Sequence, residues 1–209
     1  MENKTGLLNE LKNYIEKLST ATLSEERRRL LKPLIDYIKL KASKGEPILL
    51  HFICTHNSRR SHLAQVWAQT MIVYFNAPNI SCFSGGTEAT AVYPMVVQTL
   101  EDVGFQISKE SSAENPVYQI TYSTDEAPVH AFSKKYDDNA NPKSGFAAIM
   151  TCSQADTGCP FVTGSEGRIS IMYKDPKISD GSPQQKTIYL ERSEQIATEM
   201  KYVFSKIVH

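Results

Sequence analysis

Two stretches near the N-terminus repeat apolar residues at the spacing of a helix. Residues 5–18 and residues 30–38 each place leucines and isoleucines three and four positions apart, so that they share one face. Pro33 lies inside the second stretch and predicts that this helix kinks or restarts there. A glycine, a glutamate and a proline then end the pattern. We therefore expect residues 1–45 to form a helical extension.

The pattern changes after this extension to short apolar runs that alternate with amphipathic segments. The runs have the length of buried strands and lie at residues 48–53, 80–84, 146–152 and 168–173. Helical spacing follows them at residues 63–75, 94–103 and 196–207. This order predicts an α/β fold with three layers, in which helices cover a central, mainly parallel four-stranded sheet. Ligands of such sheets bind at the carboxyl ends of the strands.

One internal segment does not fit this alternation. Residues 114–145 contain three prolines, a stretch of alternating Tyr, Thr and Ile, and a polar run rich in Asp and Asn. This composition favours an inserted hairpin or long loop over a crossover helix. We expect residues 46–209 to form one catalytic domain that carries this insert.

Composition narrows the classes of function. The chain has 23 Lys and Arg residues against 23 Asp and Glu residues, and this zero net charge argues against nucleic acid as a partner. Its apolar runs are shorter than the ~18 residues of a membrane span, so we expect a cytoplasmic protein without a membrane partner. Four cysteines are too few for a disulfide scaffold, and they lack the two close pairs of a zinc site. A chemical role of individual cysteines is therefore the remaining possibility.

The strongest candidate for chemistry begins where the first strand ends. Cys54 stands at that point, and a helix is predicted to begin directly after the residues that follow it, which are Thr55, His56, Asn57, Ser58, Arg59, Arg60 and Ser61. A tight loop that leads into a helix N-terminus directs backbone N–H groups inward and binds a tetrahedral oxyanion. The same positive end, with Arg60 beside it, favours Cys54 as a thiolate nucleophile.

Neighbouring side chains have matching roles. Arg60 has the planar fork that contacts two oxygens of an oxyanion. Ser61 is placed to donate to the Cys54 sulfur, and the amide of Asn57 to hold the loop. The alternative is that Cys54 is an inert core residue at the end of a buried strand.

A second pair of cysteines follows another predicted strand. Cys152 and Cys159 lie seven residues apart across a polar turn, and the strand end brings Cys152 to the same sheet edge as Cys54. The two thiols form a relay if their Cα atoms come within about 7 Å. They are otherwise unrelated thiols, and spacing alone leaves both interpretations open.

An acidic residue follows the last predicted strand. Asp175 precedes Pro176, and an Asp-Pro pair commonly opens a turn. At the catalytic edge of the sheet the same carboxyl is a general acid for a leaving oxygen.

Together these residues resemble the low-molecular-weight protein tyrosine phosphatase fold, and within it the thioredoxin-coupled arsenate reductases. The resemblance covers about residues 46–113 and 145–208, and rests on the strings FICTHNSRRSHLAQVW, SGGTEATAVYP and MTCSQADTGCP with the later Asp-Pro. Plain phosphatases of this fold share the equivalents of Cys54, Arg60, Ser61 and Asp175. The segment with Cys152 and Cys159 resembles the reductases.

The resemblance implies an arsenate reductase that confers arsenic resistance. Cys54 attacks arsenate, Asp175 protonates the departing oxygen, and Cys152 then attacks Cys54, which releases arsenite. Cys159 moves the disulfide to Cys152, where thioredoxin reduces it, and no cofactor or metal is required. The first alternative is a protein tyrosine phosphatase, in which water resolves a phospho-cysteine. The second is a non-catalytic module that binds an oxyanion or a partner.

Three positions depart from the family pattern. His56 replaces a usual Gly, and Arg59 replaces a frequent Cys, where we expect it to add positive charge at the mouth of the loop. Gln65 stands where a Glu is associated with potassium in some reductases, so that cation is not predicted. The resemblance covers neither the extension nor the insert.

Overall fold

A computed structural model describes residues 6–158 and 161–207 of the chain. The N-terminal part contains helix α1 (Asn9–Lys17), the short helix η1 (Thr20–Thr22) and helix α2 (Glu25–Ser43). The next part contains β1 (Ile48–Cys54), α3 (Arg60–Tyr74), β2 (Ile80–Gly86) and α4 (Pro94–Glu101). Three short strands follow, β3 (Gln106–Lys109), β4 (Tyr118–Thr121) and β5 (Val129–Ala131). The chain continues with β6 (Phe146–Met150), α5 (Ser153–Gly158), β7 (Ser165–Ser170), η2 (Pro176–Ser179) and α6 (Gln185–Ser205).

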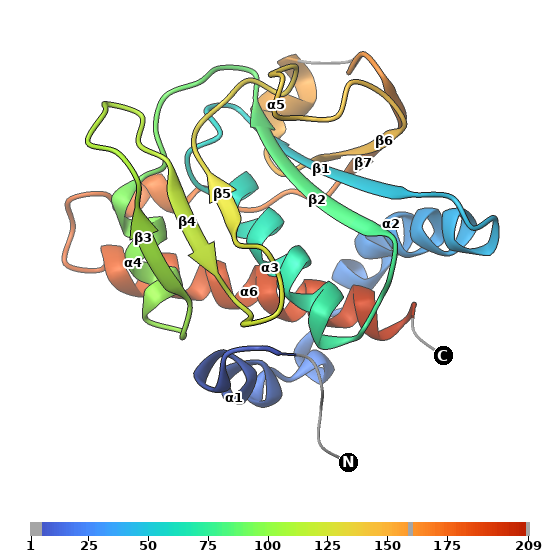
Figure 1. The fold of residues 1–209 in the computed structure, drawn as a ribbon, viewed down its shortest axis with the longest axis horizontal. Coiled ribbons are helices and arrows are strands. Elements are labelled where there is room, and N and C mark those ends of the chain that lie inside the picture. The colour runs from blue at the N-terminus through green and yellow to red at the C-terminus, as the bar shows by residue number, and fades with distance from the viewer. Residues whose placement is uncertain (1–5, 159–160, 208–209) are drawn as a thin grey trace.

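The central sheet has four strands in the order β2-β1-β6-β7, and all of its pairs are parallel. Helices α2, α3 and α6 cover one face, below the sheet in Figure 1, and the main hydrophobic core lies between them and the strands. A second, smaller cluster covers the opposite face, where Ala155 of α5 packs against Ile53, Phe146 and Met150. The predicted three-layer α/β class with a parallel four-stranded sheet is confirmed.

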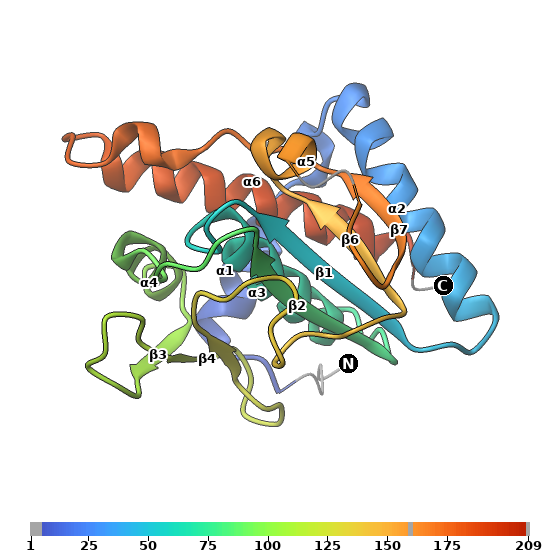
Figure 2. The same cartoon turned by 90° about the horizontal axis from the view of Figure 1, so that it is seen from above.

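The insert forms a small sheet of its own. Strands β3, β4 and β5 pair antiparallel in that order beside α4, as Figures 1 and 2 show. The hairpin predicted within residues 114–145 is thus β4–β5, whereas β3 lies before it and has no counterpart among the predicted strands. From β5 the chain returns to the main sheet, where Gly86 and Lys135 form an isolated parallel bridge. The part of the insert around Lys135 therefore lies next to the carboxyl end of β2.

The N-terminal helices share the main core with the rest of the chain. Tyr14 of α1 stacks on Trp67 of α3, with ring centroids 5.8 Å apart. Arg27 of α2 pairs with the buried Glu199 of α6 at 2.7 Å. Helix α2 runs through Pro33 as one element, so the predicted restart there is wrong. The apolar face of α2 keeps the helix continuous, since Leu31, Leu34, Ile35 and Ile38 are all buried.

Two further predictions need correction. The residues after Cys152 form the short helix α5 and not a flexible turn. Their polar sequence has no helical apolar spacing, and Ala155 is the buried anchor. The last strand, β7, begins three residues earlier than predicted and ends at Ser170. No helix in residues 6–158 and 161–207 is both long and apolar enough to cross a membrane.

Candidate active site

The loop between β1 and α3 is held from outside through its carbonyl oxygens. Those of Thr55, His56 and Ser58 each accept a hydrogen bond from a neighbouring segment: from Glu88 N at 2.8 Å, from Ser133 Oγ at 2.8 Å and from Tyr93 N at 3.0 Å. With its carbonyls turned outward, the loop directs its amides toward its own centre.

The backbone amides of the loop have no hydrogen-bond partner among the residues that the structure describes. Within the described part of the chain, none of the backbone N–H groups of residues 55–59 donates a hydrogen bond. The loop leads directly into α3, whose N-terminal end adds positive potential. Unpartnered amides at a helix N-terminus match the needs of a tetrahedral oxyanion.

Two positions make this tight path possible. Asn57 adopts a φ of +44°, in the left-handed region that Asn tolerates better than most residues. Gly86, at the end of β2, packs directly against the loop. A Cβ atom there would lie 2.6 Å from Thr55 O and 2.7 Å from Asn57 N. Any side chain at position 86 would therefore displace the loop.

A buried chain of hydrogen bonds ends on the Cys54 sulfur. Lys134 N donates to Asn57 Oδ1 at 3.0 Å, and Asn57 Nδ2 donates to Ser61 Oγ at 2.9 Å. Ser61 Oγ lies 3.1 Å from Cys54 Sγ. Since Ser61 accepts from Asn57, its own hydrogen is available for the sulfur. This arrangement supplies a donor to a Cys54 thiolate, as the sequence predicted for Ser61.

Arg60 joins the loop to the segment after β7. Its Nη2 donates to Asp175 Oδ2 at 2.5 Å, and its Nη1 donates to Tyr173 O at 3.2 Å. Arg60 Nε is buried and has no hydrogen-bond partner in the described structure. The arginine thus keeps a donor for an anion, and it holds Asp175 beside the N-terminal end of α3.

Arg59 does not place a free charge at the mouth, contrary to our expectation. Its Nη2 donates to Asp180 Oδ2 at 2.6 Å and its Nε to Tyr189 Oη at 2.6 Å. The guanidinium also lies 4.0 Å from the ring centroid of Tyr93. Asp180 neutralises the charge within the protein, because the Arg59 side chain is only 12% exposed. The ring of His56, which is also a predicted residue of the cradle, lies with its Nδ1 3.1 Å from Glu88 Oε2.

Cys152 lies on the opposite side of the same loop. Its Sγ is 3.4 Å from Thr55 Oγ1 and accepts from Ala155 N at 3.4 Å. Cys152 and Cys54 are both buried and belong to the same small hydrophobic cluster. Cys159, the third predicted member of the relay, lies outside the described residues.

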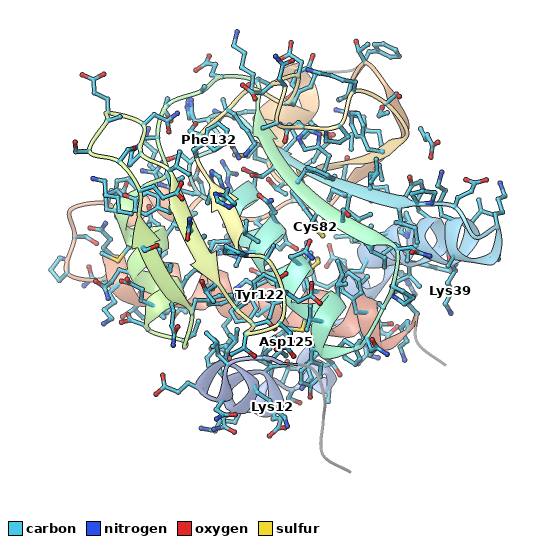
Figure 3. All side chains as sticks on the ribbon, in the orientation of Figure 1. Lys12, Lys39, Cys82, Tyr122, Asp125 and Phe132 are labelled. Carbon is cyan, nitrogen blue, oxygen red and sulfur yellow. The ribbon has the colours of Figure 1, made fainter. Side chains whose placement is uncertain are left out.

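The remaining cysteine, Cys82, lies apart from this group. It is four positions before Gly86 on β2 and is labelled midway along that strand in Figure 3. Burial raises the pKa of its thiol. Its surroundings belong to the main core.

Sequence reasoning missed the residues that support the loop from a distance. Ser133 and Lys134 come from the insert, and Asp180 and Tyr189 from the segment that leads into α6. These residues lie more than 70 positions from the loop, and no local spacing marks them. The one sequence signal that pointed to such a residue was Arg59, because an arginine in a tight loop requires an acidic partner elsewhere in the chain.

Comparisons with known proteins support the resemblance predicted from the sequence. No protein-family model matches the chain. The arsenate reductase of Staphylococcus aureus strain Newman is 28% identical over 127 residues, which are 61% of this chain and 77% of that protein. Arsenate reductase 2 of Staphylococcus epidermidis strain ATCC 35984 is 27% identical over the same lengths. The predicted similarity to arsenate reductases is therefore confirmed.

Solved structures with a related arrangement were also found. A YwlE mutant from Bacillus subtilis has a TM-score of 0.49 at 12% identity, and the match covers 77% of this chain and 98% of that chain. The thioredoxin-dependent arsenate reductase of Corynebacterium glutamicum has a TM-score of 0.41 at 18% identity, over 92% of this chain and 83% of that chain.

Proposed function

We propose that this protein is an arsenate reductase that uses Cys54 as its nucleophile and Cys152 as its resolving thiol. The observation that carries the proposal is the position of Cys152, whose sulfur lies 3.4 Å from Thr55 Oγ1 in the oxyanion loop. A phosphatase has no use for a second thiol there, because water resolves its intermediate. The curated relatives, which are named arsenate reductases, support the same activity.

The first half of the reaction is a substitution at arsenic. The loop amides and Arg60 bind arsenate, and the Cys54 thiolate forms a bond to arsenic. A hydroxyl group leaves as water, with a proton from Asp175. For this step Asp175 must exchange its contact with Arg60 for one with the departing oxygen.

The second half is a transfer of two electrons. The Cys152 thiolate attacks Cys54 Sγ, the sulfur–arsenic bond breaks, and its electron pair stays on arsenic. Arsenic is thereby reduced from the +5 to the +3 state and leaves as arsenite, while a Cys54–Cys152 disulfide forms. Attack by Cys159 on Cys152 restores the Cys54 thiolate and leaves a Cys152–Cys159 disulfide. Thioredoxin is the reductant that we propose for this last disulfide.

Phosphate monoester hydrolysis is the second candidate function. The pairing of Asp175 with Arg60 at 2.5 Å favours it, because an acid beside the oxyanion fork also protonates an aryl or alkyl leaving oxygen. Both functions require the same loop and the same nucleophile. They differ in the need for Cys152.

The test measures both activities on one set of variants. Arsenate-dependent turnover is followed with thioredoxin, thioredoxin reductase and NADPH, in parallel with hydrolysis of an aryl phosphate. We expect Cys152→Ala to abolish arsenate reduction and to leave hydrolysis intact. Cys82→Ala is the matched control, since it removes a buried cysteine outside the loop, and it should retain both activities. Hydrolysis without arsenate reduction in the unmodified protein would establish the phosphatase, and the absence of both would favour a binding module.

A further inference from the structure

Two adjacent arginines of the loop contact two aspartates that bracket η2. Arg60 pairs with Asp175, immediately before η2, and Arg59 pairs with Asp180, immediately after it. The segment between the aspartates is a single short turn, in which Asp175 Oδ1 accepts from Lys177 N at 3.1 Å. The η2 turn is therefore tied to the oxyanion loop at both of its ends.

The two pairs differ in burial and in the number of partners. The Asp180 side chain is 22% exposed, and its carboxylate accepts from Arg59 Nη2 at 2.6 Å and from Tyr189 Oη at 2.7 Å. Arg59 Nε donates to the same Tyr189 hydroxyl, which closes a triangle of hydrogen bonds. Asp175 is 38% exposed and accepts a single bond from the loop. The Arg59 pair is thus the firmer of the two.

The surroundings of Arg59 keep it away from an oxyanion. Its guanidinium lies over the ring of Tyr93, which itself stacks on Tyr189 with centroids 5.7 Å apart. Burial lowers the pKa of Arg59, but its contacts with Tyr189 and Asp180 outweigh this effect and raise the pKa overall. Arg59 therefore stays charged and occupied by its own partners.

An oxyanion bound to Arg60 competes with Asp175 for that guanidinium. Once Asp175 releases Arg60, the Arg59–Asp180 pair still joins the loop to the end of η2, whereas the bond from Arg60 to Tyr173 O reaches the chain two residues before Asp175. We propose that Arg59, Asp180 and Tyr189 form a latch that holds η2 beside the oxyanion loop, and so positions Asp175 for proton transfer while Arg60 binds the anion. This inference rests on the proposed function of Asp175 and makes Arg59 a positioning residue.

The first test compares leaving groups, because a misplaced acid matters most when the leaving group is poor. We expect Asp180→Asn to lower kcat/KM about 10-fold for phenyl phosphate and less than about 2-fold for 2,4-dinitrophenyl phosphate. Competitive inhibition by phosphate should change less than about 2-fold, because Arg60 and the loop amides are intact. In an Asp175→Asn background the same substitution should cause no further loss.

Two more variants separate the latch from general damage to the fold. Tyr189→Phe removes one hydroxyl and keeps the ring, so we expect the same leaving-group pattern with a smaller loss. Asp36→Asn is the matched control, since it breaks the exposed Lys32–Asp36 pair of α2, and it should change neither substrate. Equal losses for both leaving groups in Asp180→Asn, or no loss at all, would overturn the latch.

A second readout does not depend on turnover. Amide hydrogen exchange of residues 176–180 is measured with and without phosphate. Phosphate should leave this segment protected in the unmodified protein and should speed its exchange about 10-fold in Asp180→Asn, where both ties are lost. Unchanged exchange in Asp180→Asn with phosphate would refute the latch. Lack of both enzyme activities in the unmodified protein would refute the proposed function, while this exchange experiment would still test the latch.

Discussion

Charged groups on the two sides of the α3 N-terminus differ in their partners. We call the side with Arg59 and Arg60 the outer side, and the side with Lys134, His51 and His62 the inner side. On the outer side Arg59 and Arg60 each contact an aspartate at 2.6 Å or less. On the inner side Lys134 is buried with a carbonyl contact at 3.4 Å to Phe132 and the ring of that residue nearby. Lys134 makes no ion pair with any residue that the structure describes.

The inner side also contains two buried histidines, His51 and His62. Burial lowers the pKa of His51 and of His62 to about 3, and the charge of Lys134 adds to this effect in both. Burial also lowers the pKa of Lys134 to about 8, although Asp138 opposes this. The two imidazoles are therefore neutral near pH 7 and do not serve as acids there.

This difference in pairing assigns different roles to the two sides of the α3 N-terminus. A paired arginine can exchange a carboxylate for a bound oxyanion, since both are negative, so the outer side is suited to chemistry. The inner side holds the loop through the backbone N–H of Lys134 to Asn57. The buried ammonium of Lys134 lowers stability, and among the described residues it has no carboxylate partner that an oxyanion could replace. Substitutions on the outer side should therefore change rates, and those on the inner side should change stability.

Arg60→Lys tests the outer side most severely. Lysine keeps the charge but loses the fork that contacts two oxygens, so kcat/KM for arsenate or aryl phosphate should fall about 100-fold or more. Inhibition by phosphate should weaken in parallel. Arg28→Lys on α2 is the control and should leave both values unchanged. Unaltered kinetics in Arg60→Lys would mean that this arginine serves only to pair with Asp175.

Asp175→Asn removes the proposed proton donor. We expect about a 100-fold loss in hydrolysis of phenyl phosphate and a much smaller loss with 2,4-dinitrophenyl phosphate, whose phenolate leaves without a proton. Steady-state rates for a series of aryl phosphates measure this dependence. Equal losses across the series would show that Asp175 only forms the turn before η2.

Much of the site follows from local sequence. A strand that ends in a cysteine, a short polar loop and a helix predict the cradle, and in the structure Cys54 contacts Ser61 at the start of α3, as that pattern implies. The four parallel strands could also be predicted from the sequence, because a strand that is buried on both faces has a continuous apolar run.

The missing parts depend on tertiary contacts. The counter-charge of Arg59 lies 121 positions away, at Asp180. Strand β3 pairs only with β4 at the edge of a small sheet and is largely exposed, so it has no apolar run to reveal it. Helix α5 packs through Ala155 and is joined to β7 through Asp156, which contacts Arg168 and Ser170. Such features are set by long-range packing, which periodicity does not report.

Lys134→Met tests the inner side. The pKa of Lys134 is lowered from 10.5 to about 8, so its ammonium destabilises the folded state at pH 7. We expect this variant to raise the free energy of unfolding by about 3 kcal/mol at pH 7 in urea titrations. The folded state loses the proton first as pH rises from 8 to 10.5, so the unmodified protein should gain stability there. The variant should lack this gain, and a destabilised variant would contradict the comparison.

The smallest expected effect concerns acid. Folded His51 and His62 bind protons only near pH 3, whereas the unfolded chain binds them below about 6.5. Stability should therefore fall as pH decreases from 6.5 toward 3, by about 1 kcal/mol for each imidazole between pH 7 and 5.5. His51→Leu should reduce this pH dependence by that amount. Phe146→Leu, a buried neighbour without a titrating group, should lower stability equally at both pH values. An unchanged pH dependence in His51→Leu would contradict the neutral state of His51.

The most direct test of the account follows the thiols through a single turnover. One equivalent of arsenate is added to the fully reduced protein and to Cys159→Ser, and disulfides are located by peptide mapping under acid quench. We predict a Cys152–Cys159 disulfide in the unmodified protein and a trapped Cys54–Cys152 disulfide in Cys159→Ser, with arsenite released in both. If all four cysteines stay reduced, or if Cys82 is linked instead, the protein does not reduce arsenate by this relay.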